Sequence, residues 1–283
     1  MISHRITASA LAICISASAL TAHHFYGPYP VTLKGYDGDK TNSVSYGGQI
    51  ARQAMEQSLK KLASTGNGGG NAAEVEAQMM QYFSGPTKDL AILAPASKDG
   101  FKVKQTIIGE LSSSANLEGK FYKGLMPAWP GNHTGVDVMK DMISRAAKSN
   151  KGFDAENGYD YAQLISKFTM GAVQYSQAVD NYLDEKMTAD IKPNDMPYKE
   201  GKHYTGKEHS WDEGFGYFGA PAHTMALTPA AAYDIAKRKD MASADRNGDG
   251  VVDLKSEMVF GPAYYAAAFD KAGNTNYLAA IMQ

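Results

Sequence analysis

The sequence predicts a mainly α-helical fold, a helical bundle with long loops. Apolar residues recur at intervals of three and four in several stretches of the chain, which is the spacing of an amphipathic helix. The sequence lacks convincing alternation of apolar and polar residues, the pattern of a half-buried strand. Gly, Pro, Asn and Asp gather between the helical stretches, where they favour turns and loops.

The predicted helices span residues 46–63, 72–83, 135–148, 159–186 and 228–242. Thr228-Pro229 supplies an N-cap and an N1 proline to the last of them. Residues 100–134 give no clear assignment, and residues 277–283 end the chain in a helical pattern without a C-cap, as a sequence shortened at its C-terminus would. The longest helix is expected to bury one stripe, which comprises Leu164, Phe168, Ala172, Tyr175, Val179, Tyr182 and Leu183.

The N-terminus predicts export. Arg5 precedes the apolar stretch Ile6–Leu20, which has signal-peptide length, and Ala17-Ser18-Ala19 fits a cleavage site. A cut after Ala22 is the alternative. The predicted organisation is a signal peptide over residues 1–19 or 1–22, an extended arm over residues 20–45 and a single α-helical domain over residues 46–283.

Cys14 is the only cysteine of the chain and lies inside this apolar stretch. The residue before it, Ile13, fits a lipoprotein box poorly, so we expect a periplasmic or secreted protein without a lipid anchor. Cleavage then leaves a mature chain without cysteine, which excludes disulfides, thiolate nucleophiles and thiolate metal sites. Any metal must bind through oxygen or imidazole.

The balance of charge excludes further classes of protein. The chain of 283 residues has 28 basic and 30 acidic residues and a net charge of −2, which argues against nucleic acid as the main partner. Charged residues at 20% and hydrophobic residues at 43% are ordinary globular values. Outside the N-terminus there is no run of about 18 apolar residues, so no transmembrane span is expected in the mature chain.

Residues 245–257, DRNGDGVVDLKSE, have the pattern of an EF-hand-like calcium loop between helices, with oxygen-bearing side chains at alternating positions and Gly250 at the sharp turn. The predicted calcium ligands are Asp245, Asn247, Asp249, the carbonyl of Val251, Asp253 and Glu257. Ser256 stands where such loops place their bidentate glutamate, and Glu257 follows one residue later. The alternative is a turn rich in Asn, Gly and Asp that binds nothing.

A second cluster lies in the run EHSWDE. Residues three and four apart share a helix face, so the run predicts a first-row metal site, for iron or zinc, with Glu208, His209, Asp212 and Glu213 as ligands and His203 as a further ligand. The alternative is a set of carboxylates that favour the positive end of the helix dipole beside a core histidine.

The glycines that follow this cluster, Gly214, Gly216 and Gly219, indicate a backbone packed closely against another element and not a phosphate cradle. The metalloprotease pattern H-E-x-x-H, the hydrolase pattern G-x-S-x-G and the Walker loop are all absent. The sequence therefore assigns no catalytic residue.

The run EHSWDEGFGYFGAPA over residues 208–222 resembles the signature of a secreted bacterial domain family of unknown function, whose members accompany imelysin-like proteins. Residues 46–52, 158–186 and 249–257 resemble other blocks of that family. The resemblance implies an α-helical envelope protein linked to uptake of iron or another metal, without a demonstrated activity. Imelysins themselves have a G-x-H-x-x-E motif, from which this chain departs, because an extra residue precedes His209 and an aspartate replaces the glutamate.

The expected function is that of an exported, non-catalytic envelope protein that binds metal or a metal-loaded partner, namely another envelope or outer-membrane uptake protein. One alternative is a metallohydrolase or peptidase that activates water at Glu208, His209 and Asp212. Another is a calcium-stabilised protein-interaction module. The expected cofactors are calcium and a first-row metal.

Overall fold

The computed structural model describes residues 29–98, 100–188 and 190–283. The predicted signal peptide and Cys14 lie outside the described residues. Within them the fold is mainly helical, which confirms the predicted mainly α-helical class but not the EF-hand-like loop. The α-helices are α1 (Gly47–Ala63), α2 (Ala72–Ser84), α3 (Ile108–Leu111), α4 (Gly135–Lys148), α5 (Tyr161–Thr169), α6 (Gly206–Phe218), α7 (Pro229–Ala236), α8 (Gly261–Asp270) and α9 (Tyr277–Met282).

The remaining elements are short, with one exception, the π-helix η2 (Met170–Asp184). The 3-10 helices are η1 (Glu118–Lys120), η3 (Glu185–Met187) and η4 (Thr224–Ala226). The strands are β1 (Lys102–Val103), β2 (Phe153–Asp154), β3 (Tyr159–Asp160) and β4 (Val251–Val252). In the described ranges, no helix is both long enough and apolar enough to span a bilayer.

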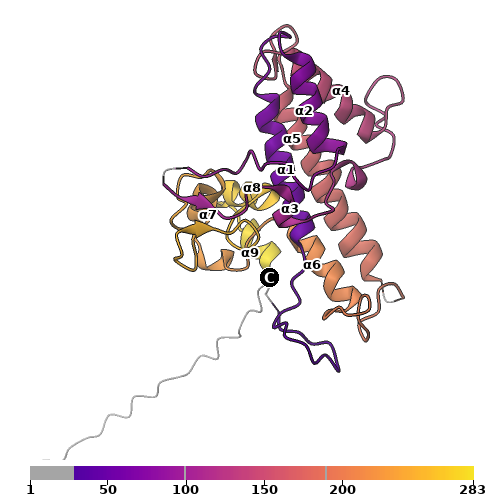
Figure 1. Cartoon of the computed structure of the whole chain (residues 1–283), viewed down its shortest axis with the longest axis vertical. Helices are drawn as coiled ribbons and strands as arrows, with labels where there is room; N and C mark the ends of the chain where they lie inside the picture. The colour runs from indigo at the N-terminus through magenta and orange to yellow at the C-terminus, as the bar shows by residue number, and fades with distance from the viewer. Residues whose placement is uncertain (1–28, 99, 189) are drawn as a thin grey trace, which may run out of the picture.

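Helices α1, α2, α4 and α5 pack side by side as a bundle, which stands upright in Figure 1. The start of α4 is fixed by a capping box, in which Thr134 Oγ1 accepts from the backbone N–H of Asp137 and the Asp137 carboxylate accepts from the backbone N–H of Thr134 at 2.9 Å. Val138, Met139 and Ile143 then face the core. The predicted bounds of α4 are confirmed, and those of α1 and α2 are right to within one residue.

The predicted helix over residues 159–186 changes its winding halfway. The chain passes from α5 into η2, where each backbone N–H bonds to the carbonyl five residues earlier. An i→i+5 helix takes more residues per turn than an α-helix, so the apolar side chains do not share one face. Ala172 and Tyr182 are buried, but Tyr175 is 61% exposed and Val179 is 41% exposed. Leu164, in the α-helical half, is also exposed, at 39%. The prediction of one buried stripe was therefore wrong for both halves of the helix.

The C-terminal residues form a second group of helices beside the bundle, drawn in yellow in Figure 1. Helix α7 packs against α8, and α8 packs against both α6 and α9. The predicted helix over residues 228–242 is shorter than expected and ends at Ala236. Arg238 has a φ of 56°, in the left-handed region, which a right-handed helix cannot continue through.

The unassigned residues 100–134 contain β1, α3 and η1. Strand β1 pairs in parallel with β4, so that Lys102 lies opposite Val251 and Val103 lies opposite Val252. The pairing connects a loop in the first half of the chain with the predicted calcium loop.

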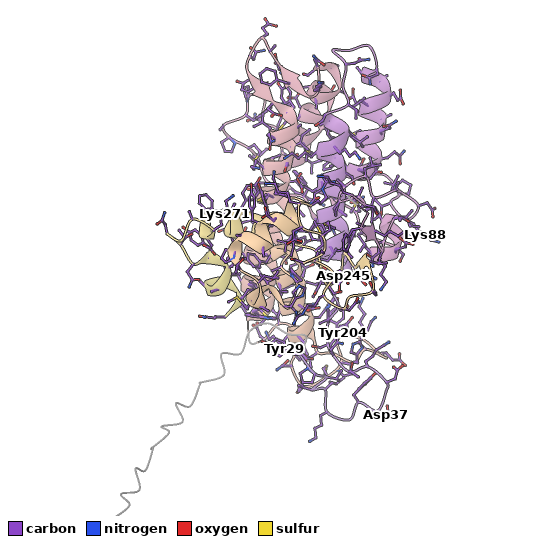
Figure 2. All side chains as sticks on the ribbon, turned by 90° about the vertical axis from the view of Figure 1, so that its left-hand side faces the viewer. Tyr29, Asp37, Lys88, Tyr204, Asp245 and Lys271 are labelled. Carbon is purple, nitrogen blue, oxygen red and sulfur yellow. The ribbon has the colours of Figure 1, made fainter. Side chains whose placement is uncertain are left out.

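The described part of the predicted arm, residues 29–45, folds back on itself below α6. Pro30 and Asn42 form an antiparallel bridge, and the backbone N–H of Ser43 donates to the carbonyl of Tyr29 at 3.1 Å. Figure 2 shows Asp37 at the far end of this loop. The arm then leads directly into α1 and remains against the first turns of α6.

Candidate functional site

The predicted metal cluster lies on α6, and its first member caps the helix. Thr205 Oγ1 accepts from the backbone N–H of Glu208, while Glu208 Oε2 accepts from the backbone N–H of Thr205 at 2.6 Å. This reciprocal capping box occupies one carboxylate oxygen of Glu208. The other accepts from Thr32 Oγ1 of the arm at 2.7 Å. The Glu208 carboxylate therefore closes the start of α6 and holds the arm.

His209 and Glu213 form a pair one turn further along. His209 Nε2 lies 3.6 Å from Glu213 Oε2, and Glu213 Oε1 accepts from Gln49 Nε2 of α1 at 2.9 Å. The imidazole packs against the rings of Tyr198 and Tyr204, at centroid distances of 4.4 and 5.0 Å. Burial lowers the pKa of His209 despite the opposing effect of Glu213. Burial therefore favours the uncharged form of the imidazole.

Asp212 points in a different direction, toward the junction of the arm and α1. It is buried and accepts a hydrogen bond from the backbone N–H of Ser45. Burial raises the pKa of Asp212 to about 8, with a smaller contribution from Glu213 and against the effect of the Ser45 hydrogen bond. Asp212 and Glu208 line a cavity of about 410 Å³ between the arm and α6.

Four of the predicted ligands thus share α6 but face different neighbours, and the fifth, His203, precedes the helix. His203 packs against the rings of Tyr36 and Tyr204 at centroid distances of 5.9 and 4.9 Å. Among the described residues, no three His, Cys, Asp or Glu side chains come together as metal ligands would. The first-row metal site stays a prediction from the sequence.

The glycines of α6 confirm the predicted close packing. A Cβ on Gly216 would lie 2.6 Å from the Cβ of Tyr46, the residue that precedes α1. A Cβ on Gly214 would lie 3.0 Å from the side chain of Leu183 on η2. Gly219, with a φ of 80°, ends the helix in the left-handed conformation that glycine adopts most readily. Helix α6 is therefore clamped between α1 and η2.

The face of α6 that looks toward η2 and the C-terminal helices borders an apolar groove of about 540 Å³. Trp211 is 47% exposed and Phe269 of α8 is 62% exposed, although both are large apolar side chains. The other apolar and aromatic lining residues include Tyr175, Val179, Leu183, Phe215, Phe218, Tyr265, Tyr277 and Ile281. The apolar spacing predicts that Tyr175, Val179 and Leu183 of η2 are buried, so the sequence did not indicate the groove. Their spacing of four along the chain was the available signal.

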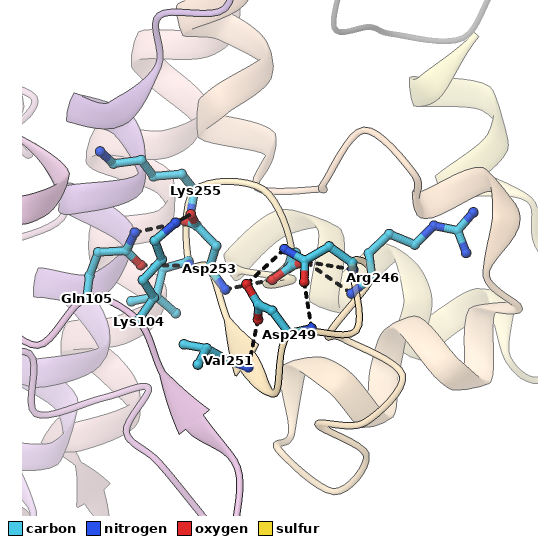
Figure 3. Close-up of polar contacts among 10 residues, drawn as sticks. Lys104, Gln105, Arg246, Asp249, Val251, Asp253 and Lys255 are labelled. Atoms are coloured by element: carbon cyan, nitrogen blue, oxygen red, sulfur yellow. Dashed lines mark hydrogen bonds and ion pairs between the residues drawn. The ribbon is translucent and has the colours of Figure 1, made fainter.

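The predicted calcium loop is closed by hydrogen bonds from its own backbone (Figure 3). Asp245 accepts from the backbone N–H groups of Gly248 and Gly250, each at 2.8 Å, and Asp249 accepts from that of Val251 at 2.9 Å. Glu257 is buried and accepts from the backbone N–H of Arg246 at 3.0 Å. The second Glu257 oxygen accepts from the backbone N–H of Asp253 at 2.7 Å, and the first is also within 3.3 Å of the N–H of Asn247.

Asp253 is the predicted ligand that turns away from the loop. Its carboxylate accepts from Lys104 Nζ and from Gln105 Nε2, each at 2.8 Å, and these groups follow β1 (Figure 3). The hydrogen bonds and the charge of Lys104 lower the pKa of Asp253 against the effect of burial. The loop also lacks the flanking helices of an EF-hand, because α7 ends at Ala236 and α8 begins only at Gly261.

The chain matches the model of a known protein family. The model of the family described as domain of unknown function DUF4856 covers residues 35–246, from the arm to the start of the calcium loop, and so includes α6. No curated protein and no solved structure matches the chain. Because the family model covers most of the chain, this protein belongs to the DUF4856 family of domains of unknown function.

Proposed function

We propose that this chain is an exported, non-catalytic binding protein of the bacterial envelope, which docks a partner protein through the apolar groove beside α6. The observation that carries the proposal is the exposure of Trp211, Tyr175 and Phe269 around one groove. Contiguous exposed apolar surface is costly in water and marks interaction sites in folded proteins. Aromatic residues are also the side chains that contribute most to interface affinity.

The shape of the groove favours an amphipathic helix as its occupant. Tyr175, Val179 and Leu183 form one ridge along η2, and the apolar side chains of α6 form a second ridge beside it. Because α6 and η2 pack closely at Gly214, the two ridges lie next to each other. A third helix can lay the apolar side chains of its own face between two such ridges.

The envelope location and the link to metal uptake come from the sequence. The N-terminal apolar stretch with its Ala17-Ser18-Ala19 site supports export, and the resemblance to a family that accompanies imelysin-like proteins supports a metal-loaded uptake protein as the partner. The mature chain should begin at Leu20 or His23 without lipid. N-terminal mass spectrometry tests this, and a lipid-modified Cys14 would contradict it.

Photo-cross-linking in intact source cells tests the docking proposal. A benzophenone side chain at Val179 or Phe269 should cross-link to an apolar helical segment of another envelope protein, located by mass spectrometry. The matched control is Tyr122, which is 45% exposed but does not line the groove. Trp211→Asp should abolish the product. Products found only with lipid or with the chain itself, or the same product from position 122, would refute the proposal.

Calcium binding is a second candidate function, favoured by the arrangement of the loop over residues 245–257. Asp245, Asp249 and the buried Glu257 are held around one turn by backbone N–H groups. Oxygen-rich loops of this kind suit a hard divalent cation. Calcium would fix the loop, and with it the pairing of β4 and β1, as in a calcium-stabilised interaction module.

A further inference from the structure

A separate cavity of about 440 Å³ lies between bundle helices α1 and α5 and C-terminal helices α7 and α8. Four cationic side chains line it, those of Lys60, Lys61, Lys237 and Arg238. The lining contains one carboxyl group, that of Glu56. Apart from Tyr265, its residues differ from those of the apolar groove.

The described residues do not neutralise the positive charge of this cavity. Lys60 Nζ donates to Gln163 Oε1 at 2.9 Å, and Lys61 Nζ donates to the backbone carbonyl of Leu93 at 3.0 Å, both of which are uncharged acceptors. Within the described ranges, none of the four lining cations forms an ion pair with a carboxylate. The cavity therefore has an excess of positive charge.

The cations also repel one another. Lys60 is half-buried, and its pKa is lowered first by burial and then by the charge of Lys167. The charge of Glu56 acts in the opposite direction, and Lys237 adds a smaller lowering effect. Lys167 contacts the adjacent wall, where its Nζ donates to the hydroxyl of Tyr265. Because these cations repel one another, the negative charge of a bound anion would offset the repulsion and stabilise the cluster.

Glu56 also lines the cavity and is only 3% exposed. Burial raises its pKa to about 6, although a hydrogen bond with Ser166 and the charges of Lys60 and Lys167 act in the opposite direction. The carboxyl group is thus near its titration midpoint at slightly acid pH, and its protonated form donates a hydrogen bond. One such group cannot balance four cations.

We propose that this cavity binds a small organic polyanion, whose carboxylate or phosphate oxygens are held by Lys60, Lys61, Lys237 and Arg238. Lysine and arginine both bind such oxygens through charge-assisted hydrogen bonds. Tyr264 and Tyr265 provide an aromatic wall for the organic part of the ligand. The volume of about 440 Å³ falls in the range of small-molecule sites.

Isothermal titration calorimetry on the mature protein tests this proposal. Citrate and inorganic pyrophosphate are the probes for the two sources of oxyanion, and acetate is the singly charged comparison. At least one polyanion should bind with a dissociation constant below a millimolar, and acetate should bind far more weakly. Lys60→Gln and Arg238→Gln should each raise the dissociation constant at least tenfold, and circular dichroism verifies that both variants are folded.

The matched control is Lys148→Gln, an exposed lysine on α4 outside the cavity, which should change the dissociation constant less than twofold. Glu56→Gln should preserve or tighten binding, because the amide keeps a hydrogen-bond donor and removes the negative charge. The proposal is refuted if neither polyanion binds at millimolar concentration, if the control weakens binding as much as Lys60→Gln does, or if Glu56→Gln abolishes binding, since a required carboxylate implies a cationic ligand.

Discussion

Gln174 of η2 donates a hydrogen bond from Nε2 to Oε1 of Gln53 on α1 at 2.7 Å, inside the core. Gln53 Nε2 in turn donates to the backbone carbonyl of Tyr217 on α6 at 2.8 Å. The two amides therefore join the three elements that position the candidate site. Buried polar groups of this kind are costly to leave unpaired.

We expect Gln53→Leu to lower the free energy of unfolding by about 2–4 kcal/mol, because it leaves the Gln174 amide and the Tyr217 carbonyl without partners in the core. Urea denaturation measures the change. The control is Gln78→Leu, an exposed glutamine on α2, which should change stability by less than about 0.5 kcal/mol. Equal stability of the two variants would contradict the role of the amide chain.

Two glycine substitutions should have opposite effects on the stability of the fold. Gly216→Ala places a methyl group 2.6 Å from the Cβ of Tyr46, so α6 must move off α1, at a cost of about 1–3 kcal/mol. Gly171→Ala, within η2, meets nothing within 4 Å and should stabilise the fold by about 0.5–1 kcal/mol. Thermal denaturation compares them, and a stabilising Gly216→Ala would show that the two helices are not in close contact.

Asp212→Asn should change stability in a pH-dependent way. The pKa of Asp212 is raised from 3.8 to about 8, so the folded state binds more protons than the unfolded state between these values. The wild-type free energy of unfolding therefore falls as pH rises across that window, on the order of 1 kcal/mol per pH unit. The asparagine of the variant does not titrate, so the free energy of unfolding of the variant should rise relative to that of the wild type from about pH 4 to about pH 8. Denaturation of both proteins at several pH values measures this, and a pH-independent difference would rule out a proton on Asp212.

Calcium should stabilise the fold through the loop over residues 245–257. A ligand that binds only the native state adds about 2.7 kcal/mol at a hundredfold excess over its dissociation constant. Asp249→Ala should remove this gain by deleting one of the central carboxylates, whereas Asp39→Ala in the arm should retain it. Melting curves in calcium and in chelator measure the effect, and identical curves for the wild-type protein would eliminate the calcium proposal.

The local elements could be predicted from the sequence because their determinants are local. The apolar spacing over residues 135–148 and the Thr134 capping box define α4 within a few residues of chain. The i→i+5 winding of η2 could not be predicted in this way, since apolar spacing does not report the hydrogen-bond register. Tyr175 and Val179 were consequently placed in the core, although they border the groove.

The candidate sites were predictable only in part, for a related reason. The sequence shows which oxygen-bearing residues make up the calcium loop and the α6 cluster. It does not show where each carboxylate points, because that depends on partners far away in the sequence. Asp253 turns toward Lys104 at a separation of 149 residues, and Asp212 turns toward Ser45 at a separation of 167 residues. The basic cavity likewise forms only where α1 and α7 meet, and no local spacing indicates that Lys60 and Arg238 share it.

The parallel pairing of β1 with β4 has a consequence for biosynthesis. Joining residues so distant in the chain requires closure of a very long loop, and the entropy of this closure makes such pairing slow. During synthesis on the ribosome, β1 cannot pair until the ribosome has added Val252 of β4. A polypeptide released at residue 246, where the family match ends, would lack the buried side chains of Val252, Leu254 and Phe260. We therefore expect the smallest independently folding unit to extend beyond the family boundary.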